Sequence, residues 1–164
     1  MPYPTLPVVE RIAASIEARL LTQFLKVVRP DQKGKLISPE DGKIILDQRD
    51  SIPNEELSHP GNPPAIAFDV AFDVYCYVRD ALSDGDYAFS FATSCNIIYS
   101  RVAYALTNPA TDPSSWYTFD GNAINSKLGD YSLIADGNGD SVGIKFPIEV
   151  TYRVSENDYT EARA

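Results

Sequence analysis

The longest regular pattern in the chain is an alternation of apolar and other side chains over residues 65–79. Its odd positions are small, acidic or amphipathic, and its even positions are apolar: Ile66, Phe68, Val70, Phe72, Val74, Cys76 and Val78. Because successive side chains of a strand point to opposite faces of a sheet, this pattern predicts a strand with one face in the core. At about 3.3 Å per residue it would be about 50 Å long, so it either bends or continues past the domain as a long β-arm.

A second alternating pattern, over residues 144–154, predicts another amphipathic strand. Pro147 lies in its middle and has no N–H for a ladder, so we expect this strand at a sheet edge or with a bulge there. Shorter patterns predict strands at 25–29, 43–48, 116–119 and 131–135, and a short or irregular piece at 123–128.

Apolar residues at helical spacing predict two amphipathic helices. The first covers residues 6–23, with Thr5 as its N-cap, and the second covers 87–107 and is stopped by Asn108 and Pro109. The order of helix, strands, helix and strands shows no regular βαβ alternation. It therefore predicts one α+β domain over residues 1–164, with a largely antiparallel twisted sheet and both helices packed on one face.

Two segments fall outside these elements. Residues 49–64 are polar and contain four prolines and the single histidine, so we expect a mobile loop or the tip of an arm. We expect this segment to move in the free protein and to become ordered when it contacts a neighbouring subunit. Residues 156–164 are mostly polar and charged, and we expect this C-terminus to fray.

Composition narrows the classes of function. The net charge is −9 and the pI about 4.5, which argues against a protein that grips nucleic acid, because phosphate binding needs clustered Lys and Arg. No signal peptide and no bilayer-spanning stretch is recognised, so we expect a protein made and used on the cytosolic side. Cys76 and Cys95 occupy apolar positions and are interpreted as small buried hydrophobes in a reducing compartment.

Candidate chemistry is sparse. Asp136, Asn138 and Asp140 resemble the start of a calcium loop, but the sixth and twelfth positions are Ser141 and Pro147, and a hairpin turn is favoured. His59 is the single histidine, and the sequence offers no further ligands that would complete a zinc site with it. Asp69 and Asp73 would lie about 13 Å apart on a strand, which is too far for two carboxylates that flank one scissile bond. No common nucleophile, phosphate-loop or zinc motif occurs in the sequence, so we expect no metal or cofactor. Because these catalytic motifs are missing, a structural or interaction protein is favoured over an enzyme.

A family resemblance rests on short strings spread over most of the chain. The first predicted strand ends in Arg29-Pro30, and later strings are 41–46 (DGKIIL), 63–68 (PPAIAF), 119–125 (FDGNAIN) and 149–159 (EVTYRVSENDY). This layout resembles the small tail-terminator and neck proteins of tailed bacteriophages. The resemblance implies a hexameric ring, assembled in the host cytoplasm and located in the virion, that caps the tail tube and docks to the head–tail connector. The resemblance implies no catalysis and no cofactor. It also implies that DNA passes through the ring without being bound specifically.

A channel for DNA is expected to have an acidic wall, since such a wall repels phosphate. We expect part of the acidic set to face this lumen: Asp69, Asp73, Asp84 and Asp86. Tyr-rich faces, long strands and sheet edges suit subunit contacts, for which the candidates are Arg49, Glu55, Glu56, His59, Tyr75 and Tyr77.

Two alternatives stay open. One is another neck, head–tail joining or tail-completion protein. The other belongs to a different class, a small cytosolic enzyme or ligand-binding domain with an unrecognised site, which a deep pocket with converging polar groups would favour.

Overall fold

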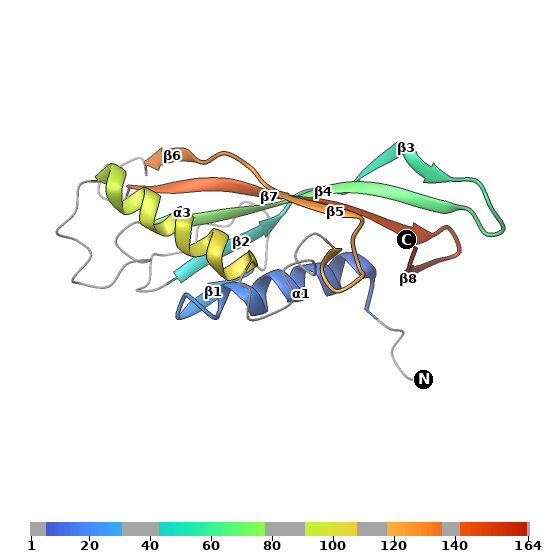
Figure 1. Cartoon of the computed structure of the whole chain (residues 1–164), viewed down its shortest axis with the longest axis horizontal. Helices are drawn as coiled ribbons and strands as arrows, with labels where there is room; N and C mark the ends of the chain where they lie inside the picture. Colours follow the sequence, from blue (N-terminus) through green and yellow to red (C-terminus); the bar gives the residue numbers. More distant parts are fainter. Residues whose placement is uncertain (1–5, 31–42, 78–90, 108–117, 136–141, 164) are drawn as a thin grey trace.

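The chain forms two helices and one strongly curled, mostly antiparallel sheet in the residues that the computed structural model describes, 6–30, 43–77, 91–107, 118–135 and 142–163 (Figure 1). The predicted α+β class is confirmed. The helices are α1 (Val8–Leu20) and α3 (Phe91–Thr107). The strands are β1 (Lys26–Val28), β2 (Lys43–Gln48), β3 (Ile52–His59), β4 (Ala65–Tyr77), β5 (Asn125–Leu128), β6 (Ser132–Ala135), β7 (Val142–Ser155) and β8 (Asp158–Ala162).

Strands β4 and β7, which carry the two alternating patterns, pair with each other along the whole of β4, from Ala65 opposite Ser155 to Tyr77 opposite Gly143. On the other side of β4, β2 pairs with one half and β3 with the other. On the other side of β7, the partners are β6, β5 and β8 in turn. Strand β1 joins β2 in parallel, and every other described pairing is antiparallel.

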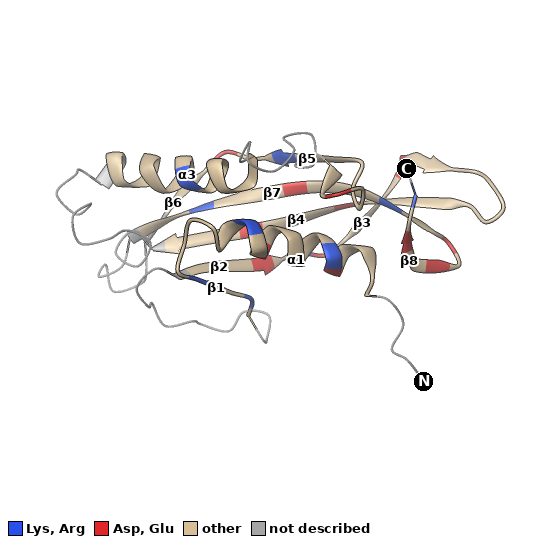
Figure 2. Ribbon diagram, turned by 60° about the horizontal axis from the view of Figure 1, so that its bottom comes forward, with Lys and Arg blue, Asp and Glu red and all other residues tan. Residues whose placement is uncertain are grey.

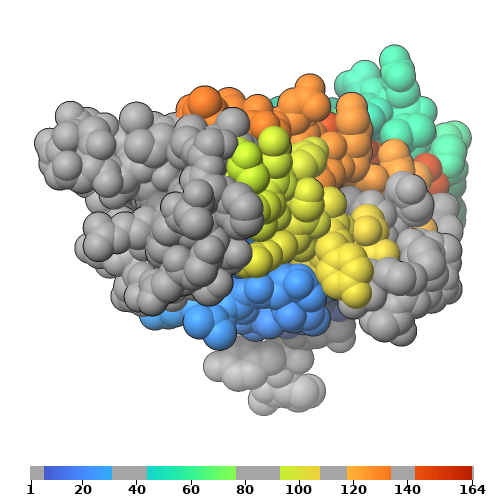
Figure 3. Space-filling model, turned by 60° about the vertical axis from the view of Figure 1, so that its left-hand side comes forward, coloured from blue at the N-terminus to red at the C-terminus, as the bar shows by residue number. Residues whose placement is uncertain are grey.

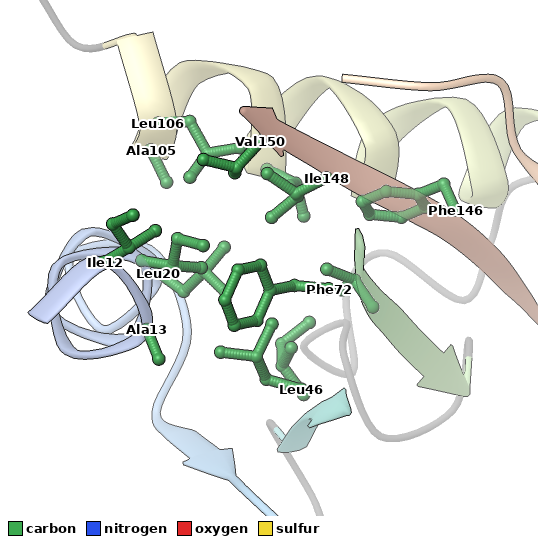
Figure 4. Packing of buried hydrophobic residues seen from close by; sticks show 14 of the residues in the cluster. Ile12, Ala13, Leu20, Leu46, Phe72, Ala105, Leu106, Phe146, Ile148 and Val150 are labelled. Carbon is green, nitrogen blue, oxygen red and sulfur yellow. The ribbon is translucent and has the colours of Figure 1, made fainter. Parts of the chain in front are cut away.

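The core lies between the helices and the apolar face of the β4–β7 ladder (Figure 4). Cross-strand pairs such as Phe72 with Ile148 and Val74 with Phe146 stack bulky side chains along this face. The helices close it with buried side chains at helical spacing: Ile12, Ile16 and Leu20 of α1, and Ile98, Val102 and Leu106 of α3. In the space-filling view α3 lies between α1 and the segment that carries β5 and β6 (Figure 3).

The first helix is shorter than predicted at both ends. It begins after Pro7, whose carbonyl oxygen accepts hydrogen bonds from the N–H groups of Glu10 and Arg11. The predicted cap Thr5 lies outside the described residues. The helix ends at Leu20, and the turns that follow it bury Phe24 in the core. The apolar spacing that predicted a longer helix therefore extends past the end of the helix.

The secondary structure differs from the sequence predictions in three places. Residues 118–121 form a turn rather than the end of a strand, with Phe119, Asp120 and Gly121 at φ values of 44°, 60° and 89°, and Phe119 is buried from this turn. Residues 49–64, expected as a mobile loop or the tip of an arm, contain strand β3, which pairs with the free edge of β4; their mobility in the free protein stays a prediction. The polar C-terminus forms β8 along β7 instead of fraying. Strands β3 and β8 are hairpin partners of the adjacent β4 and β7, but their own sequences are largely polar and carry no alternation that would predict a strand.

Pro147 also departs from expectation, because β7 is an interior strand and not an edge. The proline lies opposite the gap between the last residue of β5, paired with Ile148, and the first residue of β6, paired with Lys145. In this gap the N–H of Gly129 donates to the Pro147 carbonyl oxygen at 2.8 Å, and the Gly129 carbonyl accepts from the Tyr99 hydroxyl at 2.9 Å. Pro147 has no N–H to donate, and at this position the neighbouring strands are interrupted, so no ladder hydrogen bond from residue 147 is needed. A central strand can therefore accommodate a proline here.

Gly129 is required by this close approach, which generates a first prediction. A Cβ at position 129 would lie 2.5 Å from Cγ and 3.0 Å from Cδ of Pro147. We expect Gly129→Ala to lower the free energy of unfolding by about 1–3 kcal/mol in urea denaturation. The same substitution in a Pro147→Ala background should cost clearly less, because the clashing ring atoms are gone. An equal cost in both backgrounds would contradict this contact.

Candidate functional site

A hollow of about 770 Å³ lies on the face of the sheet that the helices leave uncovered. It is lined by Ala71, Asp69 and Asp73 of β4, by Glu149 and Thr151 of β7, and by neighbouring residues of β2, β5 and the β2–β3 connection. Acidic residues recur on β2 and β7 in this part of the sheet (Figure 2). The sheet thus has an apolar face under the helices and a polar face opposite, where acids outnumber bases in the lining of the hollow.

The hollow exists because the side chain at its centre is small. Ala71 lies opposite Glu149 in the β4–β7 ladder, between two longer acidic side chains at positions 69 and 73. The carbonyl oxygen of Ala71 accepts a hydrogen bond from the N–H of Arg49 at 2.8 Å, which holds the β2–β3 connection against β4. Residues of β2, β4, β5, β7 and the β2–β3 connection therefore surround the methyl group of Ala71.

Asp73 sits deep in this site. Its side chain is only 5% exposed, and Oδ2 accepts a hydrogen bond from Nε of Arg49 at 2.6 Å and lies 3.8 Å from Nζ of Lys145. This hydrogen bond raises the pKa of the Arg49 guanidinium above its ordinary value. The other carboxylate oxygen, Oδ1, is buried and has no hydrogen-bond partner within the described part of the chain. An unmade hydrogen bond on a buried carboxylate is costly, so this oxygen is a conspicuous feature of the site.

The structure corrects the expected position of Asp73. The sequence put Asp69 and Asp73 together in a set expected to face a lumen, whereas Asp73 is buried and ion-paired and only Asp69 is exposed. Asp69 accepts hydrogen bonds from Thr151 Oγ1 at 2.6 Å and Asn54 Nδ2 at 3.0 Å. The two positions share a strand face, but β2 and the Arg49 side chain cover only one of them.

Three further acids line the hollow and were not singled out from the sequence: Asp47, Asp50 and Glu149. Asp47 lies directly opposite Asp73 in the β2–β4 register, and Glu149 lies diagonal to it on β7. Among the described residues, no hydrogen bond or close ion pair is recorded for the carboxylates of Asp47 and Glu149, but Lys127 lies opposite Glu149 in the β5–β7 register, and the charge of Glu149 contributes to the raised pKa of Arg49. The alternation in the sequence put Glu149 on the polar face of its strand, but only the register shows that both acids surround Ala71.

The other predicted contact residues are dispersed. Glu55, Glu56 and His59 are exposed on β3, outside the hollow. Tyr75 is half-buried, with Nζ of Lys145 5.2 Å from its ring centroid. Asp84, Asp86 and the side chain of Tyr77 lie outside the described residues. Arg49, predicted as a contact to a neighbour, instead makes the central ion pair within the chain.

Both cysteines are buried free thiols, as their apolar positions predicted. Burial raises the pKa of Cys76 well above its ordinary value and also raises the pKa of Cys95. In the described part of the chain, no three His, Cys, Asp or Glu side chains are grouped so that they could hold a metal ion. None of the helices described is long and apolar enough to cross a bilayer.

Comparison of the sequence with models of known protein families finds no match, and comparison with curated proteins finds no significant match.

The buried ion pair generates a second prediction. Replacing Arg49 by Met leaves the Asp73 carboxylate buried with only the more distant Lys145, and we expect a loss of about 1–3 kcal/mol in the free energy of unfolding. Adding Asp73→Asn removes the uncompensated charge and should recover more than half of that loss. Urea denaturation of the two single variants and the double variant measures this coupling. Additive effects would show that the pair does not stabilise the sheet.

Proposed function

We propose that this chain is a structural subunit of a tailed-phage virion, forming a ring that terminates the tail tube and joins it to the head–tail connector. The resemblance of its strings and layout to tail-terminator and neck proteins is one support. The second support is an arm of the sheet that projects beyond both helices. This arm consists of β3, β8 and the parts of β4 and β7 that pair with them (Figure 1).

The arm is ordered by its own contacts. Arg153 of β7 is buried and donates from Nε to the Leu57 carbonyl oxygen of β3 at 2.9 Å, which places its side chain across the small Ala67 of β4. On the opposite face the Phe68 ring stacks on Tyr152 at 5.5 Å and lies 5.8 Å from Tyr159. The arm is therefore a built element with polar and aromatic contacts on its two faces.

Large apolar side chains of the arm remain open to solvent. Ile52 is 65% exposed, Tyr159 is 51% exposed and Leu57 is 38% exposed. An extended arm with exposed apolar groups and an edge strand is suited to burial against a neighbouring subunit. A head-to-tail ring needs one such patch to meet a different patch on the next copy, and ring closure prevents a filament. This arm is the observation that carries the proposal.

The acidic hollow fits the same proposal if the helix-free face borders the channel. Exposed Asp69 and Glu149 would then present negative charge to passing DNA, whose phosphates they repel. The alternatives within the virion, another neck, head–tail joining or tail-completion protein, use the same features. The alternative of a ligand-binding domain has one observation in its favour, the hollow with its converging polar groups.

Ring formation is tested on the purified chain by native mass spectrometry, alone and with tail tubes. We expect a closed oligomer, most simply a hexamer, and slower amide hydrogen exchange at residues 52–59 in the oligomer than in the free subunit. The double variant Ile52→Lys/Leu57→Lys should remain folded by circular dichroism but lose the oligomer, because charge replaces exposed apolar contacts. Leu21→Lys, at a similarly exposed position beside α1, is the matched control. A wild-type chain that stays a single subunit in both conditions would refute the ring.

The lumen assignment gives a separate prediction. The double variant Asp69→Lys/Glu149→Lys should still form the oligomer but reduce the yield of infectious particles, because lysines in the channel bind the phosphates that the acids repel. Asp130→Lys, an exposed position between β5 and β6, serves as the control for a change in charge alone. Unchanged yield and DNA passage in the double variant would place this face away from the channel.

A further inference from the structure

We propose that strand β3 of one subunit docks into a groove beside α3 of the next copy of this chain. This contact rests on the proposed ring and deepens it, because it names the two patches that meet. One patch is a bulge in β3. The other is a groove of about 360 Å³ along the outer side of α3.

The bulge in β3 arises because this strand has more residues than β4 can pair. Between Asn54 and His59 the register shifts, so residues 55–58, here called the β3 bulge, lie opposite Ile66 alone. Surplus residues of this kind leave the ladder and project from the edge of a sheet. The first three residues of the bulge, two glutamates and Leu57, are exposed.

Hydrogen bonds fix the shape of the β3 bulge. The N–H of Leu57 donates to Oδ1 of Asn54 at 3.2 Å, and the Ser58 hydroxyl donates to the Asn54 carbonyl oxygen at 2.8 Å. The N–H of Ala67 donates to the Ser58 hydroxyl at 3.0 Å, and Arg153 donates to the Leu57 carbonyl oxygen. A segment that is ordered before contact loses little conformational entropy on binding, so this bulge is suited to docking.

The groove beside α3, here called the α3 groove, combines apolar side chains with one cation. Half-buried Ile97 and exposed Tyr104 line it at helical spacing, with Arg101 between them. Gln23, in the turns after α1, also contributes to the lining. The space-filling view shows α3 at the surface between α1 and the segment that carries β5 and β6 (Figure 3).

The charges of the two patches are opposite. The sequences of β3 and β8 in the arm contain no Lys or Arg and four acids: Glu55, Glu56, Asp158 and Glu161. Helix α3 contains no acid, and Arg101 is its one charged residue (Figure 2). Two copies of a chain with a net charge of −9 repel each other in general, so an acidic arm is directed to the acid-free surface of α3.

The positions of the two patches favour a head-to-tail contact. The arm projects at the end of the molecule where α1 begins, and Gln23 of the α3 groove lies just after α1 ends (Figure 1). Two different patches at separate places let each copy use one patch on each neighbour. Leu57 would then pack beside Ile97 and Tyr104 of the next subunit, with the glutamates of the bulge near Arg101.

The test is disulfide cross-linking between two variants of the full chain, Leu57→Cys and Tyr104→Cys. Under mild oxidation we expect the mixture to give at least about fivefold more cross-linked dimer than either variant alone, because docking brings the two Cβ atoms within about 4.5 Å. Leu57→Cys mixed with Leu133→Cys, an exposed position on β6, is the matched control. The native cysteines are both buried.

Charge reversal tests the same contact without new thiols. Glu56→Lys and Arg101→Glu should each weaken the oligomer at least about tenfold on dilution in native mass spectrometry, and mixing the two variants should recover most of this loss. Asp130→Lys, which changes the charge equally at an exposed position between β5 and β6, should leave the oligomer unchanged. Circular dichroism verifies that each variant is folded.

The outcomes separate the docking contact from the ring. An oligomer that cross-links no better through positions 57 and 104 than through the control pair overturns the docking and leaves the ring standing. Cross-linked open chains that never close support the docking and refute the ring. Single subunits throughout, with no cross-link, overturn both.

Discussion

The antiparallel ladder between β4 and β7 is the constraint on which the rest of the structure depends. It runs the full length of β4, and it brings two alternating sequences into a register that puts every bulky apolar side chain on one face. A slip of one residue would exchange the two faces of a strand, so the buried pairs of Phe72 and Val74 specify the register strongly. All the shorter strands except β1 are added to the free sides of this pair.

The same register creates the polar face. The positions between the apolar residues place Asp73, Ala71 and Asp69 in line on β4, with Pro147, Glu149 and Thr151 opposite. Burying Asp73 there is expensive, and the ion pair with Arg49 offsets the cost only for one oxygen. The ion pair also joins the β2–β3 connection to the middle of β4, so the two partners of β4 meet at this point.

Along its length the sheet has two parts, one covered by the helices and one that forms the arm. Under α1 and α3 the sheet is one side of an ordinary two-layer domain, with a continuous core. At the end of this core Phe68 packs on Tyr152 and Tyr159, and the arm beyond carries exposed apolar groups. An apolar surface left uncovered in this way is a feature of proteins that meet a partner, and it connects the fold to a proposed role in assembly.

The sequence by itself determined the fold class, both helices and the two long strands, because their side-chain periodicities are local properties of the chain. Only the tertiary structure decided that residues 52–59 and 158–162 are strands, that Pro147 occupies an interior strand, and that Asp73 is buried while Asp69 is not. Each of these depends on a neighbouring group that side-chain periodicity does not record: the free edges of β4 and β7, the gap at Gly129, and the Arg49 guanidinium. Periodicity tells which face a residue takes, but what covers that face is set by strand pairing.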